Sequence, residues 1–126
     1  MLRCVTLAAL AAVLALPAAA QIVVQRKLAP NSLRGELVVT QPPEVQLNGK
    51  PARLAPGARI HGENNLLVLS GTIVGQKLAV NYTRELHGEL LEVWILNASE
   101  RARLWPKTAE EAASWRFEPL SQTWTK

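Results

Sequence analysis

The 126-residue sequence predicts a mainly β protein: a small antiparallel barrel of five to six strands with a short C-terminal helix. Three observations predict this class. Short segments with an apolar residue at every second position recur along the chain, tight-turn residues separate them, and a helix-capping pattern is found only near the C-terminus. The connections are too short for the crossovers of a parallel α/β sheet. A closed barrel is favoured because closure removes exposed strand edges.

Three strands are expected in the first half of the barrel, at residues 35–40, 44–47 and 50–54, and residues 58–60 resume the alternation of the third. Pro42-Pro43 ends the first of them, since proline cannot continue a strand ladder. Asn48-Gly49 predicts a tight hairpin, because both central residues of such a turn adopt positive φ. Ala55-Pro56-Gly57 predicts a further turn.

Three more strands are expected at residues 66–69, 77–83 and 91–96. The continuous apolar run 66–69 predicts a strand buried on both faces. Strict alternation in 77–83 directs three side chains inward, those of Leu78, Val80 and Tyr82. In the last strand the inward residues are expected to be Leu91, Val93 and Ile95, and the opposite face carries Leu90, Trp94 and Leu96.

The C-terminal segment is predicted to contain a short helix that begins after Thr108 and cannot extend past Pro119. Thr108 and Glu111 match a capping box, in which each side chain accepts a hydrogen bond from the other residue's amide. Four tryptophans lie between residues 94 and 124. Because a small barrel rarely exposes so much apolar surface, the tail is expected to cover the Trp94 face as a second core. Its expected members are Leu104, Trp105, Trp115, Phe117 and Leu120. The alternative is an exposed aromatic binding patch.

Residues 1–20 have the three parts of a secretory signal. Arg3 supplies the positive start, residues 5–16 form an apolar run too short to span a bilayer, and Ala18-Ala19-Ala20 suits a signal peptidase. Cleavage near Ala20 would deliver a periplasmic or secreted protein with no transmembrane segment in the mature chain. Residues 21–32 are then a lead-in, and residues 33–126 form a single barrel domain with its helix and tail.

Composition excludes several chemistries. The sequence contains no aspartate, and its single cysteine, Cys4, lies in the leader. Disulfide frameworks, cysteine metal sites, thiol catalysis and Asp-dependent triads are therefore excluded in the mature chain. No glycine-rich phosphate loop or Gly-x-Ser-x-Gly elbow is present, and no cofactor is expected.

Two clusters carry the residue types of a metal or acid–base site, and their candidate ligands are His61, Glu63, His87 and Glu89. Each cluster adjoins a glycine at a predicted turn, so solvated loops explain them at least as well. A small envelope enzyme or metal-binding protein using these residues is the alternative function.

A formal net charge of +4 makes a binding surface for anionic partners worth considering. The candidate residues are Arg53, Arg59, Lys77 and Trp94. Nucleic acid is not expected, because single-strand readers add several stacking aromatics to their cations, and the barrel region offers only Tyr82 and Trp94. An envelope protein or an anionic envelope polymer fits better.

Several segments resemble small exported β-barrel modules of bacteria, some of them OB-like: residues 45–49, Leu54, Ile60, residues 73–80 and residues 88–95. The mature chain is also similar to uncharacterised exported proteins of Gram-negative bacteria. The resemblance implies an OB-like or SH3-like barrel and an envelope location, and it transfers no catalytic residue. We therefore expect a non-enzymatic exported module that binds a partner or ligand.

Overall fold

A computed structural model describes residues 25–126, so the expected signal at 1–20 and the mature start at Gln21 lie outside the described residues. Five strands form the main body: β1 (Leu33–Gln41), β2 (Glu44–Leu47), β3 (Lys50–His61), β4 (Leu78–Arg84) and β5 (Leu90–Ile95). The remaining elements are the short 3-10 helix η1 (Ser70–Thr72), helices α1 (Ala98–Ala102) and α2 (Ala109–Ser114), and strands β6 (Arg116–Glu118) and β7 (Thr123–Thr125).

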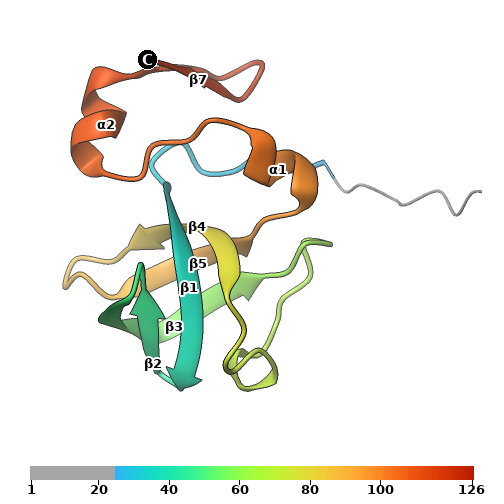
Figure 1. The fold of residues 1–126 in the computed structure, drawn as a ribbon, viewed down its shortest axis with the longest axis vertical. Helices are drawn as coiled ribbons and strands as arrows, with labels where there is room; N and C mark the ends of the chain where they lie inside the picture. Colours follow the sequence, from blue (N-terminus) through green and yellow to red (C-terminus); the bar gives the residue numbers. More distant parts are fainter. Residues whose placement is uncertain (1–24) are drawn as a thin grey trace, which may run out of the picture.

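The five strands close into a barrel in the order β1-β2-β3-β5-β4, with β4 pairing back onto β1 (Figure 1). The predicted small barrel is confirmed. One pair differs from the all-antiparallel expectation, because β3 and β5 run parallel. Residues 62–89, which include β4, connect them and provide the long crossover that a parallel pair requires. Of the two expected barrel types, this strand order is the OB-like one.

The barrel interior is filled by the alternate residues of all five strands. Its buried members from the strands are Leu37, Val39, Val45, Leu47, Leu54, Ile60, Val80, Tyr82, Leu90, Val93 and Ile95. Ile73, from the β3–β4 connection, completes this core. The inward side of 77–83 is as predicted, with Leu78 only partly buried.

The predicted hairpin at Asn48-Gly49 is confirmed, since both residues have positive φ, 54° and 78°. Leu47 pairs with Lys50 across the turn. The Asn48 side-chain oxygen also accepts a hydrogen bond from the Glu36 amide at 2.9 Å, which ties the turn to β1.

Gly49→Val is expected to lower the free energy of unfolding by about 1 kcal/mol or more. A Cβ at Gly49 would meet no atom within 4 Å, so the cost comes from the backbone alone. Gly71→Val is the matched control, because Gly71 is equally open and has no positive φ. Urea denaturation of both variants measures the difference; equal effects would contradict a conformational role for Gly49.

Ala55-Pro56-Gly57 does not form a turn, and the alternating segments 50–54 and 58–60 belong to one continuous strand, β3. The pairing register shifts between Leu54 and Arg59, and Gly57 has a φ of 80°. A register shift of this kind is typical of a bend in the strand. It lies between the part of β3 that pairs with β2 and the part that pairs with β5. Turn residues in the sequence here mark a bend rather than a reversal.

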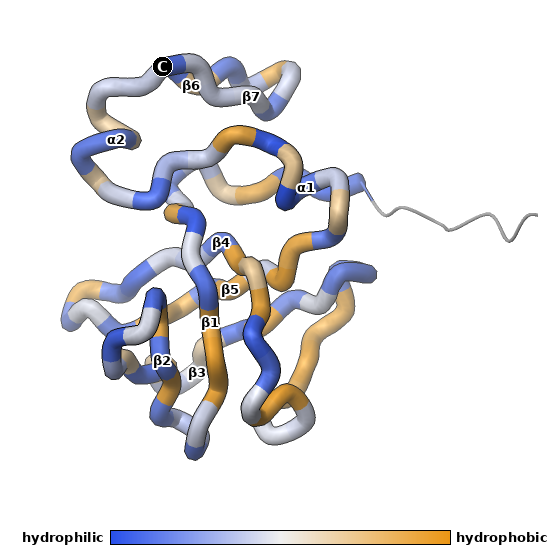
Figure 2. The backbone as a smooth tube through the Cα atoms, in the orientation of Figure 1, coloured by the Kyte–Doolittle hydropathy of each residue, from blue (hydrophilic) through white to orange (hydrophobic). Residues whose placement is uncertain are grey.

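The expectation of a doubly buried strand at 66–69 is wrong. Leu66, Leu67 and Leu69 are 67%, 66% and 77% exposed, and only Val68 packs partly against the barrel core. The segment forms a small loop beside the end of β3, where the Val68 amide donates to the Ile60 carbonyl at 2.8 Å. Because β4, rather than residues 66–69, closes the barrel onto β1, this segment runs alongside the barrel as part of the β3–β4 connection (Figure 2, lower right).

In β5 the structure buries Leu90 in the barrel core and leaves Leu91 37% exposed, which reverses their predicted sides. A register shift opposite Tyr82 and Arg84 inserts one extra residue into β5. Such a bulge changes the face of the residues before it, so simple alternation fails there.

The tail lies as a separate layer over one end of the barrel (Figure 1). The predicted second core is confirmed in outline: Leu28, Leu96 and Trp105 are buried together, and the half-buried members are Ala79, Trp94, Phe117 and Trp124. Leu104 and Leu120, at 44% and 96% exposed, do not belong to it. Trp115 is also outside, with the Lys126 ammonium 5.4 Å from its ring. The β6–β7 hairpin, which pairs Phe117 with Trp124, brings Trp124 into the place expected for Trp115.

Both short helices have side-chain caps. Thr108 caps α2 as predicted, accepting from the Glu111 amide at 3.2 Å, but the reciprocal bond from Glu111 is not formed. The complete capping box belongs to α1, where Asn97 and Glu100 accept from each other's amides. It fixes Glu100 at the junction between barrel and tail.

A buried polar network fastens the lead-in to this junction. The Arg26 guanidinium makes two bonds of 3.0 Å to the Glu100 carboxylate, and both side chains are 4% exposed. Arg26 also donates to the Gly62 and Ile95 carbonyls. With Leu28 buried as well, residues 26–28 are an integral part of the fold rather than a loose lead-in.

A second arginine crosses from the barrel to the tail. Arg34 donates to the Asn81 side chain at 2.8 Å and to the Arg103 carbonyl at 3.1 Å. Burial lowers the pKa of Arg34, and the nearby Glu100 charge acts in the opposite direction. Asn81, which alternation places outside the barrel, is fully buried here, and its side-chain amide donates to the Ser32 hydroxyl at 3.1 Å.

Candidate functional site

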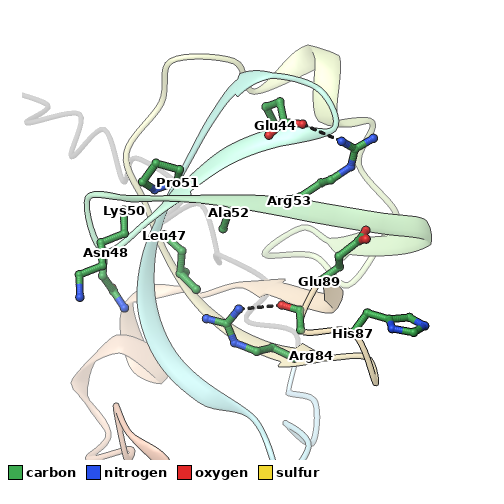
Figure 3. A pocket seen from close by; sticks show the side chains of 11 residues that line it. Glu44, Leu47, Asn48, Lys50, Pro51, Ala52, Arg53, Arg84, His87 and Glu89 are labelled. Atoms are coloured by element: carbon green, nitrogen blue, oxygen red, sulfur yellow. Dashed lines mark hydrogen bonds and ion pairs between the residues drawn. The ribbon is translucent and has the colours of Figure 1, made fainter.

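The candidate residues predicted from the sequence lie mainly in two grooves on the barrel. The first, called the β2–β3 groove, has a volume of about 570 Å³ and lies between the β2–β3 hairpin and the β4–β5 loop (Figure 3). The side chains that define it are those of Glu44, Leu47, Lys50, Arg53, Arg84 and Glu89. The second, called the β3–β5 groove, is about 730 Å³ and is defined by Lys27, Arg59, His61, Asn65, Glu92 and Trp94.

The hairpin supplies one wall of the β2–β3 groove. Its register places Glu44 opposite Arg53, and the two side chains form a 3.0 Å ion pair that is more than half exposed. Such an exposed pair contributes under about 1 kcal/mol to the stability of the fold. The fold therefore does not depend on this pair. Leu47 and Ala52 supply apolar surface between Lys50 at one end and Glu89 at the other (Figure 3).

The β4–β5 loop supplies the other wall and is organised by Glu85. Its carboxylate accepts from the His87 amide at 2.7 Å and from the Glu89 amide at 2.9 Å. These two bonds, with a smaller effect of the His87 charge, lower the pKa of Glu85. Arg84 donates to the Gly88 carbonyl at 2.8 Å, and the His87 ring points outward (Figure 3). The wall is therefore held in one conformation by its own hydrogen bonds.

The charges of this groove are mixed, with an excess of cations. Lys50, Arg53 and Arg84 face Glu44 and Glu89. Within residues 25–126, Lys50 forms no ion pair. An open surface with an excess of cations and an apolar floor is suited to non-covalent binding of a polar, mainly anionic partner.

The candidate metal ligands are not brought together. His61 lies in the β3–β5 groove and His87 in the β2–β3 groove, while Glu63 is 3.5 Å from Arg101. Within the part of the chain that the structure describes, no group of three or more His, Cys, Asp or Glu residues is arranged to hold a metal ion.

The four candidates for a binding surface are also divided. Arg53 lines the β2–β3 groove, Arg59 and Trp94 line the β3–β5 groove, and Lys77 is exposed just before β4, in neither. They do not form one continuous surface.

Sequence reasoning missed two interactions in these grooves. The Glu44–Arg53 pair could have been predicted, because counting residues outward from the Asn48-Gly49 turn places these two opposite each other. The 2.7 Å contact between His61 Nε2 and Glu92 Oε2 could not, because it depends on the parallel pairing of β3 and β5.

Comparisons of the chain with protein-family models, curated proteins and solved structures find no match. Among residues 25–126, no helix has the length and apolar character needed to cross a membrane. The fold and the grooves thus define the class: a five-stranded barrel of OB-like connectivity with an aromatic tail layer and two open polar grooves.

Proposed function

We propose that this chain is a non-enzymatic binding module, exported to the cell envelope, that holds its partner in the β2–β3 groove. The observation that carries the proposal is the groove itself, which lies between the β2–β3 hairpin and the β4–β5 loop. The loop is stabilised by hydrogen bonds from its own amides to the Glu85 carboxylate. Barrels of OB-like connectivity use the strand 2–3 face and the 4–5 loop for ligands, and the choice of this face follows that analogy.

The chemistry of the groove supports an anionic envelope polymer or an acidic face of an envelope protein as the partner. Lys50, Arg53 and Arg84 outnumber the two carboxylates, and Lys50 and Arg53 lie on the exposed hairpin. The export half of the proposal rests on the leader, with Arg3, the apolar run 5–16 and the small residues 18–20.

The alternative, a small envelope enzyme or metal-binding protein, depends on His61, His87 and nearby glutamates acting together. The two histidines line different grooves. Stoichiometric zinc in the purified protein, lost in the double variant His61→Ala, His87→Ala, would favour this alternative over the binding module.

The experiment that tests the groove compares two double charge reversals of the full chain on a column carrying dextran sulfate. Lys50→Glu with Arg53→Glu changes the groove, and Lys77→Glu with Lys107→Glu makes the same change in net charge at exposed residues that line neither groove. The groove variant is expected to bind at least about tenfold more weakly and to elute at lower salt than the control. Equal weakening of both variants would show that only net charge matters and would contradict a site at the β2–β3 groove.

A further inference from the structure

The β3–β5 groove lies on the outer face of the barrel, where side chains of neighbouring strands form rows. One row crosses four strands through His61, Trp94, Asn81 and Arg34, which are successive partners in register. Asn81 is buried against Ser32, and Arg34 bonds to the tail at Arg103. His61 and Trp94 are the two residues of this row that line the open groove. The neighbouring row begins with Arg59 and Glu92, which are also partners.

The rings of His61 and Trp94 are stacked on each other. The planes of His61 and Trp94 differ by 10°, and their centroids are 5.5 Å apart. His61 is fixed by the 2.7 Å contact with Glu92, whose amide donates to the Thr83 hydroxyl at 3.2 Å. Trp94 is half-buried and packs against the tail core. A ligand that contacts this stack would therefore lose little free energy in ordering the two rings.

The polar groups around this stack offer both donors and acceptors. Arg59 and Lys27 are exposed cations, Glu92 is a partly exposed carboxylate, and the Asn65 side chain can donate and accept. A phosphate chain would meet the Glu92 charge, and a cationic ligand would meet Arg59 and Lys27. A hydroxyl-rich ligand suits this mixture, because every hydroxyl both donates and accepts.

We propose that the β3–β5 groove binds a carbohydrate chain, with the apolar face of a pyranose ring against the exposed side of the Trp94–His61 stack. The ring hydroxyls bond to Arg59, Glu92 and Asn65, whose side chains line the same groove. An aromatic ring suits the apolar face of a sugar, and the indole is the largest such surface among the side chains. This groove is separate from the β2–β3 groove, so the two proposals succeed or fail independently.

The test follows the indole N–H signal of Trp94 by NMR while the full chain is titrated with two neutral probes. One probe is a tetramer of N-acetylglucosamine and the other a tetramer of glucose, each up to about 10 mM, since weak sites have dissociation constants in the millimolar range. A saturable shift with the N-acetylglucosamine tetramer alone would identify the ligand as an amino-sugar chain. A shift with the glucose tetramer as well would show that the groove does not require the N-acetyl group. Arg59→Ala and Glu92→Gln are each expected to weaken binding about fivefold or more.

Arg53→Ala, in the other groove, is the control and is expected to leave the titration unchanged. Arg59 is exposed and is therefore replaced without loss of core packing, whereas replacing Trp94 would disturb the tail. No shift of the Trp94 signal with either probe would overturn the proposal. An equal loss of binding in Arg53→Ala would overturn the assignment to this groove.

Discussion

Arg26→Ala is expected to lower the free energy of unfolding by about 3–5 kcal/mol, because it leaves the Glu100 carboxylate buried without its partner. The pair is 4% exposed on both sides and is joined by two 3.0 Å bonds. Arg26 also donates to the Gly62 and Ile95 carbonyls, at the ends of β3 and β5. Urea denaturation followed by far-ultraviolet circular dichroism measures the change.

Arg53→Ala is the matched control, since Arg53 forms an ion pair of the same length that is more than half exposed. Its expected cost is under about 1 kcal/mol. The double variant Arg26→Met, Glu100→Gln is expected to lose less stability than the two single changes added together, because neither charge is then left alone. Similar costs for Arg26→Ala and Arg53→Ala would contradict the role given to the buried pair.

Trp105→Ala is expected to cost about 3–5 kcal/mol, the usual range for removing a buried aromatic side chain. Trp105 is 3% exposed, and its indole N–H donates to the Ser32 carbonyl at 2.8 Å. Its ring also meets Phe117 at 5.8 Å and Trp124 at 5.9 Å, both edge-on. The change therefore removes the centre of the tail core as well as a buried hydrogen bond.

A double-mutant cycle of Trp105→Ala and Trp124→Ala is expected to show coupling, because the two rings are in contact. Trp115→Ala serves as the control and should cost much less, since Trp115 lies outside the core. Thermal denaturation of the single and double variants measures the coupling and the cost of each change. A large effect of Trp115→Ala together with a small effect of Trp105→Ala would contradict the packing described.

The parts of the fold that the sequence predicted well are those determined by local patterns. Asn48-Gly49 requires positive φ at both residues and so identifies its hairpin without reference to the rest of the chain. Alternation in residues 77–83 correctly identified the inward residues, because β4 has regular neighbours over most of its length. Barrel closure was predicted because it removes exposed strand edges, and it is observed.

The errors arose where a distant element decides the outcome. Leu90 and Leu91 exchange sides because of a bulge that forms only against β4. Leu69 is exposed because β4, rather than residues 66–69, closes the barrel. Trp124 replaces Trp115 because the β6–β7 hairpin folds the end of the chain back, and three-residue strands leave almost no periodic signal.

The candidate sites show the same division. Arg53 and Glu44 could be paired by counting from the turn. Arg59 and Trp94 were both named as binding residues, but that they share a groove with His61 follows from the parallel β3–β5 register, which no local pattern indicates. The separation of His61 from His87 likewise depends on the barrel topology.

Site-specific photocrosslinking in cells that produce the full chain tests the binding proposal most directly. A photoreactive residue is placed at Lys50, in the β2–β3 groove, and in a second variant at Lys107, which lies outside that groove. We expect an envelope component to be captured from position 50 and not from position 107. Equal capture from both positions, or capture from position 107 alone, would contradict the proposal that the β2–β3 groove holds the partner.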